Sequence, residues 1–293
     1  MGGDGWIYIN LRSNGASMVD GMIIKSKNFN IAQIAESGQC FRMNYIKDNT
    51  YCLVAYENYL ELTQVDPETI RLSCSEEMYE SVWANYFDMF YDYNGIVGRL
   101  ARGEDPFLRE AVTYGQGIRI LRQEAFEAMI SFIISQNKNI PAIKNCIEAI
   151  CRHYGDAKID PECGGITYYT FPTPQRLGAA REEELRGLGL GYRDRYVLSA
   201  AQAVSDGTIL LENLVDCSFE EAVSVLKTIH GIGEKVANCI ALFGLHHIEA
   251  FPVDVWIDRV LKEVYQGKFE KEKYSGYAGI VQQYMFYYAR HRI

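Results

Sequence analysis

Two residues of this 293-residue chain, Lys235 and Asp254, have the types and the setting that covalent chemistry needs. Lys235 follows a glycine-rich segment and begins an apolar-periodic stretch, so it is expected in the first turn of a helix. There it experiences the positive end of the helix dipole, and partial burial beside Val236 and Ala237 would further disfavour its charged form. A neutral lysine is a nucleophile, which makes Lys235 a candidate for covalent catalysis.

The segment before the lysine predicts a phosphate-binding helical hairpin. Gly231 and Gly233 separate two apolar-periodic stretches, residues 219–229 and 235–245, and glycine permits positive φ and close backbone approach. The free amides at the start of the second helix then form an anion site suited to one phosphate. An ordinary corner between two packed helices would show the same glycines, so this signal does not decide by itself.

Asp254 follows Pro252 and precedes an apolar run, which is the position of a helix N-cap. For an isolated aspartate, a structural cap is the simpler interpretation. The combination with Lys235 beside a phosphate-binding turn favours a catalytic interpretation.

These segments resemble a known family. HGIGEKVANC (residues 230–239) and PVDV (252–255) are similar to the signature of the helix-hairpin-helix DNA glycosylases, and the lysine resembles that of the bifunctional glycosylase/lyase members. Within this superfamily the chain resembles the 8-oxoguanine DNA glycosylases of base excision repair most closely, and we interpret it as a prokaryotic member. Supporting segments occur in family order: SGQCFR (37–42), QGIRILRQ (116–123), SFIISQNKNI (131–140), LGLGYRDRYV (188–197) and YAG (277–279).

The resemblance implies a reaction on double-stranded DNA that contains oxidised guanine. The damaged base is flipped out, Lys235 attacks C1′ of the sugar, and Asp254 stabilises the developing positive charge. A Schiff base forms, and β-elimination then cleaves the strand. No cofactor is implied, although a structural monovalent or calcium ion is implied at the hairpin, on the backbone carbonyls of Lys227, Ile229 and Ile232.

The resemblance also implies the residues that bind the base. Gln282 and Phe286 share one face of the last expected helix, because they are four positions apart. Phe286 is expected to stack on the base with Cys239 on its other face, and Gln282 to bind the Watson-Crick edge. The carbonyl of Gly38 would accept the N7 hydrogen that oxidised guanine has and guanine lacks, and Pro252 would contribute to the same pocket.

DNA contacts are expected at three further places, of which the resemblance implies the first and the residue types suggest the other two. Asn137 is expected to enter the space left by the flipped base, although asparagines in such loops are commonly helix caps. Tyr192 and Arg193 are expected to wedge into the base stack, with a core tyrosine beside a solvated arginine as the alternative. The hairpin residues expected at a phosphate are Gly231, Gly233 and Val236.

Two positions depart from the family. Ala142 stands where eukaryotic relatives carry an arginine that reads the opposite cytosine, so weak discrimination of the opposite base is expected. Trp256 stands where those relatives have a histidine, which removes one expected phosphate contact.

The formal net charge of −9 argues against a protein that binds nucleic acid mainly by bulk electrostatics. Binding then depends on hairpin amides and a local basic face, for which the candidates are Arg119, Arg122, Lys138 and Arg193. We expect a monomer whose non-specific affinity for DNA is modest and sensitive to salt.

The eight cysteines form no C-x-x-C pair, so zinc spacing is absent. None follows Cys239, which excludes the C-terminal iron-sulfur loop of the related endonuclease III. Scattered thiols are typical of a reducing compartment, and we expect a cytoplasmic, nucleoid-associated protein. No apolar run approaches the roughly 20 residues of a membrane helix, and the N-terminus lacks the features of a signal peptide.

The periodicity predicts an α+β fold. Residues 1–21 are expected to be a leader or a disordered segment, residues 22–105 an antiparallel β-sheet domain, and residues 106–293 a helical catalytic region with the active site between two helical subdomains. Within the helical region we expect a loop at 155–173 and helices near 173–188, 192–205 and 274–290.

Two alternatives remain open. A monofunctional glycosylase for alkylated bases would activate water and would have no need of Lys235. A non-catalytic DNA-binding module would use the hairpin as a phosphate clamp, but it would leave Lys235, Asp254 and the Gln282/Phe286 face unexplained.

Overall fold

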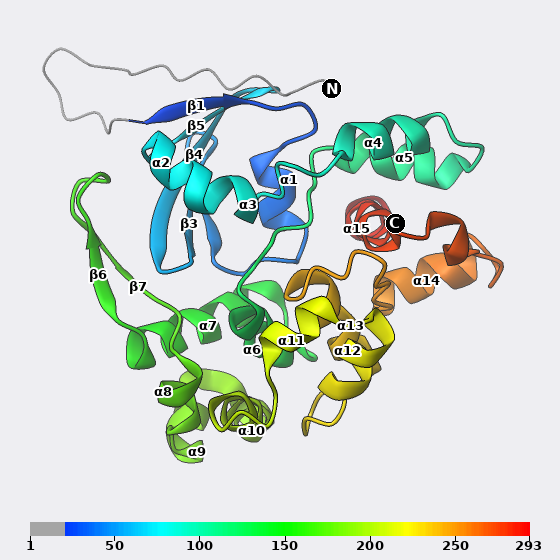
Figure 1. Ribbon diagram of the computed structural model, residues 1–293. Helices are drawn as coiled ribbons and strands as arrows, with labels where there is room; N and C mark the ends of the chain where they lie inside the picture. Colours follow the sequence, from blue (N-terminus) through cyan, green and yellow to red (C-terminus); the bar gives the residue numbers. More distant parts are fainter. Residues whose placement is uncertain (1–20) are drawn as a thin grey trace, which may run out of the picture.

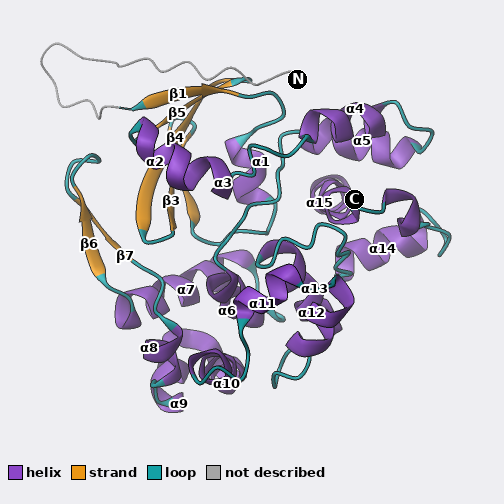
Figure 2. Cartoon of the chain, viewed as in Figure 1, coloured by secondary structure: helices purple, strands orange, loops and turns teal. Residues whose placement is uncertain are grey.

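The computed structural model describes residues 21–293, so the expectation of a leader at residues 1–21 lies, apart from Gly21, outside the described residues. A five-stranded antiparallel sheet at the N-terminal end is followed by a mostly helical region, which confirms the predicted α+β class (Figures 1 and 2).

The sheet has the strand order β1-β5-β4-β3-β2, and each neighbouring pair is antiparallel. Strands β2 to β5 follow one another as a meander, and β5 also pairs with β1, the first strand of the chain. The strands are β1 (Met22–Lys25), β2 (Met43–Lys47), β3 (Thr50–Ala55), β4 (Asn58–Asp66) and β5 (Thr69–Leu72). Alternate residues point to one buried face, where Leu53, Leu60 and Leu62 are fully buried, as expected for a sheet with one solvated side.

A short helix, α1 (Ile31–Glu36), connects β1 to the meander. The Asn30 side chain caps it by accepting the amide of Gln33, and Ile31 and Ile34, three positions apart on one helix face, are both fully buried. The helix ends at Ser37, so Gly38 lies in the loop that enters the interior of the molecule.

After the sheet, the chain is helical. Its helices include α2 (Glu76–Met78), η1 (Tyr79–Trp83), α3 (Ala84–Tyr86), α4 (Tyr93–Ala101), α5 (Pro106–Gly115), α6 (Ala125–Ser135), α7 (Ile140–Tyr154), α10 (Asp194–Ser205), α11 (Leu211–Asp216), α12 (Phe219–Leu226), α13 (Glu234–Phe243), α14 (Val255–Glu263), η4 (Lys271–Tyr274) and α15 (Ala278–Arg292). Helix α15 lies between the α4/α5 pair and α14, and the chain thus returns to the sheet end of the molecule (Figure 1).

Two expectations for the middle of the chain were wrong. Residues 155–173 contain a hairpin, β6 (Ala157–Asp160) and β7 (Ile166–Tyr169), which extends beside the sheet and is anchored there by the bond of Tyr168 to the Glu57 carbonyl (Figure 1). The helix expected at 173–188 is broken into α8 (Pro174–Gly178), α9 (Glu182–Leu185) and η2 (Arg186–Leu190). The two strands pair with each other, but neither has a buried residue, so the segment lacks the alternating apolar pattern that would predict a strand.

Buried apolar side chains form two large clusters. One joins the sheet to the helices up to Met89 and includes Leu121, and the other runs from Tyr93 through the helical region and includes Phe41. Phe41 therefore leaves the sheet segment and packs in the helical core, which brings the loop of Gly38 to the helices. No helix among residues 21–293 has the length and apolar character needed to cross a membrane.

Candidate active site

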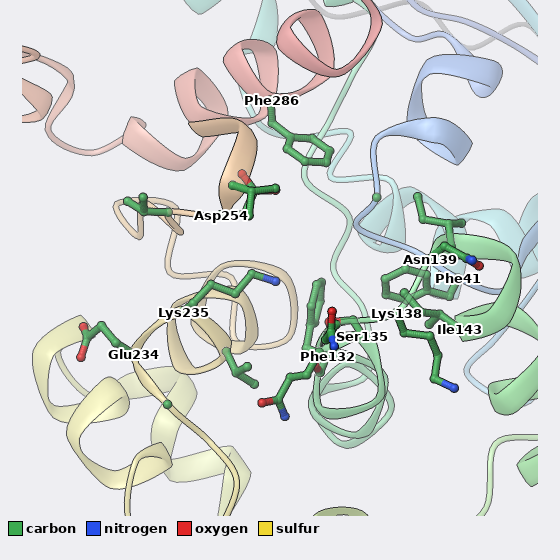
Figure 3. Close-up of a pocket in the computed structure, with 18 of the residues that line it drawn as sticks. Phe41, Phe132, Ser135, Lys138, Asn139, Ile143, Glu234, Lys235, Asp254 and Phe286 are labelled. Carbon is green, nitrogen blue, oxygen red and sulfur yellow. Dashed lines mark hydrogen bonds between the residues drawn. The ribbon is translucent and has the colours of Figure 1, made fainter. Parts of the chain in front are cut away.

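A cavity of about 1140 Å³ opens among segments from across the chain (Figure 3). It is bordered by the loop between α6 and α7, by η3 (Gly191–Arg193), and by the starts of α13 and α14. The Gly38 loop and α15 complete it. Of the residues predicted from the sequence, the cavity gathers Gly38, Asn137, Tyr192, Gly233, Lys235, Val236, Asp254 and Phe286.

Lys235 is the second residue of α13, and its side chain extends into the cavity toward the segment that carries Asp254 (Figure 3). The expectation of partial burial was wrong, because Lys235 is exposed while Val236 and Ala237 are buried beside it. The open cavity accounts for this, since the lysine faces it and its two neighbours face the core. An exposed amine on a fixed helix start is accessible to a substrate.

Asp254 is the N-cap of α14, as its sequence position predicts. Its Oδ1 accepts the amides of Trp256 at 3.1 Å and Ile257 at 2.9 Å. Burial raises the pKa of the Asp254 carboxyl above its ordinary value, and the Ile257 amide and the positive charge of Lys235 oppose that shift. The carboxylate is thus held in a fixed direction, near a cation, by backbone bonds.

The turn before α13 has the geometry of an anion site. Gly231 has φ +90°, and a Cβ there would lie 2.2 Å from Cγ of Tyr196, so only glycine fits. No side chain caps α13 at Gly233, and the amides of residues 234–236 donate to no acceptor within residues 21–293. Together with the helix dipole, these amides suit one phosphate.

Opposite the hairpin, Gly38 and Phe286 are in contact. Gly38 has φ +75°, and a Cβ built on it would lie 3.2 Å from Cε1 of Phe286. Phe286 reaches the cavity from α15 (Figure 3). The backbone of one end of the chain and an aromatic ring from the other end thus form a flat, apolar wall.

Gln282, Pro252 and Cys239 lie behind the cavity surface and do not line it. Gln282 is buried and donates to the Pro252 carbonyl at 3.0 Å, and its Oε1 accepts from Gln283 at 3.3 Å. Cys239, one helical turn beyond Lys235, is also buried, and burial raises the pKa of its thiol to about 11 against the opposing effect of Lys235.

The loop of Gly38 is held by two glutamines that the sequence interpretation missed. The buried Gln39 side chain donates to the Arg119 carbonyl and accepts the Leu121 amide, each at 2.8 Å. Gln123 donates to the Gln39 carbonyl at 2.8 Å. Both glutamines lie in segments noted for their resemblance, SGQCFR and QGIRILRQ, and no local pattern distinguishes them as structural.

Asn137 and Tyr192 project from neighbouring turns at the cavity rim. Asn137 is exposed with φ +49°, a conformation that asparagine tolerates better than most residues. The next asparagine, Asn139, is the helix cap, since its side chain accepts the Ala142 amide at 3.0 Å. Tyr192 is half exposed, with the Arg193 guanidinium 4.3 Å from its ring centroid.

Arg193 does not reach the rim. It is buried and donates to the carbonyls of Gln136, Asn137 and Leu190. The expectation that its side chain wedges into DNA is contradicted, because the guanidinium is buried and bonded to these carbonyls. The sequence gives no sign of the carbonyls that surround it.

The expected basic face is also contradicted in part. Arg119 is buried between Phe29 and Tyr93, and Arg122 is paired with Asp88 at 2.8 Å. The cations that line the cavity are Lys138 and Lys235, against the acids Glu234, Asp254 and Asp258. Backbone amides therefore supply much of the positive potential of this surface.

Within residues 21–293 no three His, Cys, Asp or Glu side chains are placed to hold a metal ion. The backbone carbonyls proposed for an ion belong to the turn before α13. That of Ile229 accepts the Ile232 amide at 3.1 Å, while those of Lys227 and Ile232 accept no bond from the described residues.

Comparison with known families divides the chain in two. Residues 22–129 match the family described as 8-oxoguanine DNA glycosylase, N-terminal domain. Residues 130–276 match the HhH-GPD superfamily of base excision DNA repair proteins.

Individual relatives agree with this result. An N-glycosylase/DNA lyase of Saccharomyces cerevisiae is 38% identical over 162 residues, which cover 52% of this chain and 43% of that protein. A probable N-glycosylase/DNA lyase of Methanothermobacter thermautotrophicus is 30% identical, with 70% and 72% covered. The Clostridium acetobutylicum 8-oxoguanine glycosylase/lyase, solved with double-stranded DNA containing cytosine opposite to 8-oxoG, superposes with a TM-score of 0.86 at 34% identity, covering 92% of this chain and 95% of that one.

Proposed function

Because the chain belongs to the HhH-GPD superfamily and to its 8-oxoguanine glycosylase/lyase family, we propose that it excises 8-oxoguanine from double-stranded DNA and then cleaves the strand. The observation that carries the proposal is that Lys235 and Asp254 line the same cavity as Gly38 and Phe286. One cavity thus holds a nucleophile, a carboxylate and a flat surface for a base.

Base recognition requires that the damaged nucleotide leave the duplex, at a cost of about a few kcal/mol. Stacking on Phe286 and hydrogen bonds inside the cavity offset this cost. The Gly38 carbonyl accepts no hydrogen bond from the described residues, so it is available for the N7 hydrogen of oxidised guanine. Guanine lacks that hydrogen and would leave the carbonyl unpaired, which is the basis of discrimination.

Two of the proposed base contacts need a local rearrangement. Gln282 already donates to Pro252, and Cys239 is covered by its neighbours. A base that enters the cavity has to approach both, so we propose that side chains around Phe286 change rotamer when the base binds. The Watson-Crick edge would then meet Gln282 and the Pro252 carbonyl.

In the chemical step, the neutral amine of Lys235 attacks C1′ and the bond from C1′ to the base breaks, with the electron pair leaving on the base. Asp254 stabilises the positive charge on the sugar, because its carboxylate is held in place by the start of α14. The sugar ring opens to a Schiff base with Lys235. Loss of a C2′ proton expels the 3′ phosphate, and water finally releases the lysine.

The hairpin amides of residues 234–236 would hold a backbone phosphate beside this centre. Asn137 would fill the gap in the duplex, and Tyr192 would wedge beside it, since both lie at the cavity rim. Ala142 has only a methyl group in the first turn of α7 and offers no donor to the opposite base, so excision should depend weakly on that base.

We further propose a monovalent or calcium ion on the carbonyls of Lys227, Ile229 and Ile232, since neutral oxygens of this kind suit such ions. It would stiffen the turn and take no part in the reaction. The eight cysteines are free thiols, in keeping with the reducing cytoplasm that we propose as the compartment, and we propose that the protein acts as a monomer.

Borohydride trapping on defined duplexes tests the proposal. The protein is incubated with duplexes that carry 8-oxoguanine, a 3-alkylated adenine analogue or no lesion, and covalent adducts are measured together with base release. We expect an adduct and base release with 8-oxoguanine, and neither with the undamaged duplex.

Base release without an adduct would favour the monofunctional alkylbase glycosylase. DNA binding without base release would favour the non-catalytic module. The same assay with cytosine, adenine, guanine or thymine opposite the lesion should give rates within a few-fold of one another. A strong preference for cytosine would contradict the inference from Ala142.

A further inference from the structure

Three segments that border the cavity meet at one residue, Gln136, through its side chain and its backbone carbonyl. It follows the last residue of α6 and is half buried. Its Nε2 donates to the Ile133 carbonyl of its own helix at 3.1 Å and to the Gly231 carbonyl of the hairpin turn at 3.1 Å. The first bond lies within the C-terminal turn of α6. The second joins two residues that are 95 positions apart in the sequence.

The backbone of Gln136 makes a second connection. Its carbonyl accepts from Nε of Arg193 at 2.7 Å and also from Nη2 of the same guanidinium, and the Asn137 carbonyl accepts from Nη2 at 3.1 Å. Arg193 belongs to the turn that carries Tyr192. The turn that carries Asn137 is therefore bound on one side to the hairpin and on the other to the Tyr192 turn.

The hairpin and the Tyr192 turn are also in contact with each other. Tyr196, in the first turn of α10, packs so closely on Gly231 that a Cβ there would lie 2.2 Å from its ring, and the ring also meets His230 edge to face at 4.9 Å. Lys138 completes the connection by donating to the Gly189 carbonyl at 2.9 Å. The three segments thus form a closed set of contacts.

The two carbonyls that face the side chain at position 136 require two donor hydrogens, which glutamine supplies. Nε2 carries two hydrogens and faces two carbonyls, so its donor capacity is filled. A glutamate would present an acceptor to both carbonyls, and an apolar side chain would leave them without a donor. Asn137 has φ +49°, a conformation that costs free energy and persists only when its surroundings hold it.

We propose that Gln136 is a positioning residue that sets the distance between Asn137 and the phosphate-binding hairpin. Binding of a backbone phosphate by the hairpin and entry of Asn137 into the duplex then occur as one event, because the two segments move together. The inference rests on the proposed function and extends it from the residues that touch DNA to one that acts through them.

The test compares two reactions of the same protein. Excision of 8-oxoguanine from a duplex requires the gap in the helix to be filled, whereas cleavage at a preformed abasic site in a single strand does not. Gln136→Met keeps the length of the side chain without its donor, and Gln136→Glu replaces the donor by an acceptor. Gln116→Met is the matched control, because Gln116 also follows the last residue of a helix and is exposed away from the cavity.

We expect the ratio of single-turnover duplex excision to single-strand cleavage to fall about tenfold in Gln136→Met, in line with the loss of one hydrogen bond between segments, and further in Gln136→Glu. The ratio should stay at the wild-type value in Gln116→Met. Normalising to single-strand cleavage removes any loss of correctly folded protein.

A ratio unchanged in both Gln136 variants, or a parallel fall of the two reactions, would overturn the inference and leave Gln136 a helix ending. The proposed function fails separately, if the wild-type protein forms no trapped adduct and releases no base. That result would be visible before any variant is examined.

Discussion

The two walls of the cavity differ in composition and in origin. The hairpin wall, made of residues 233–236 and 253–255, holds the ionisable side chains of Lys235, which is exposed, and Asp254, which is partly buried. The base wall, made of Gly38, Phe41 and Phe286, is apolar. The first comes from one short stretch of chain, whereas Gly38 and Phe286 are 248 positions apart (286 − 38).

We infer from this difference that the hairpin wall serves the reaction and the base wall serves recognition of the base. The hairpin wall depends on helix starts, because the amides of α13 and the cap of α14 are fixed by local backbone geometry. The base wall depends on tertiary packing, because Gly38 and Phe286 face each other only when Gln39, Gln123 and α15 are in place. Changes to the first wall should affect bond breaking, and changes to the second should affect which base is accepted.

The largest expected effect is that of Lys235→Gln. The variant should form no trapped adduct, and excision and strand cleavage should both fall by about a thousandfold or more, because the nucleophile is lost. Duplex binding, measured by fluorescence anisotropy, should change little, since the hairpin amides are unaltered. Lys268→Gln, an exposed lysine away from the cavity, serves as the control; a trapped adduct in the Lys235 variant would assign the chemistry to another residue.

Two substitutions of Asp254 should separate its effect on the excision rate from its effect on the stability of the fold. Asp254→Asn keeps an oxygen for the amides of Trp256 and Ile257 but loses the charge, so excision should fall about a hundredfold without a decrease in Tm. Asp254→Ala loses the cap as well and should destabilise the fold by about 1 kcal/mol. Equal activity in wild type and Asp254→Asn would reduce this residue to a structural cap.

A smaller effect is expected at the base wall. Gly38→Ala puts a Cβ 3.2 Å from Cε1 of Phe286, a distance at which the ring has to shift, so excision of 8-oxoguanine from duplex should fall about tenfold because the wall that receives the base is displaced. Cleavage of a preformed abasic site, which has no base to bind, should be retained.

Gly165→Ala is the matched control, because Gly165 has φ +77° with nothing within 4 Å of a Cβ. It shares the backbone strain but not the neighbour. If both variants lose excision equally, strain and not the base wall is responsible.

The smallest expected effect is on pH dependence. Because burial raises the pKa of Asp254, the acid limb of the excision rate should lie above the value of about 4 that is ordinary for aspartate. A pKa raised by folding contributes stability that is present below the unfolded value and lost as pH rises through the folded value. Thermal melts should therefore show Asp254→Asn gaining stability relative to wild type as pH rises above about 4, and a constant difference would contradict a raised pKa.

Much of the fold followed from periodicity. The meander, the capped α1 and the helices around the hairpin have alternating or 3.6-residue apolar patterns, which reflect one buried face for each element. The hairpin β6–β7 was not predicted, because its two strands pair with each other but are only four residues long and have no buried residue, so no alternating apolar pattern marks them. The break between α8 and α9 was missed as well.

The candidate site divides in the same way. Residue types and spacing identified Lys235, Asp254 and the glycine turn, and the resemblance added Gly38 and Phe286. The environment of Arg193 was misjudged, because an arginine after a glycine turn looks solvated until the carbonyls around it are known. The structural roles of Gln136 and Gln39 could not be predicted, because a glutamine that joins two segments and an exposed one have the same local sequence pattern.

The sequence by itself determined which residues begin the helices beside the cavity, and with them the nucleophile, the aspartate cap and the free amides. Those features are local, because a helix start depends on a few consecutive residues. Only the tertiary structure decided that Lys235 is exposed, that Arg193 is buried, and that Gln136 joins the hairpin to the Asn137 turn. These depend on backbone carbonyls brought in from distant segments, and a carbonyl is identical at every position of the chain until the fold places it.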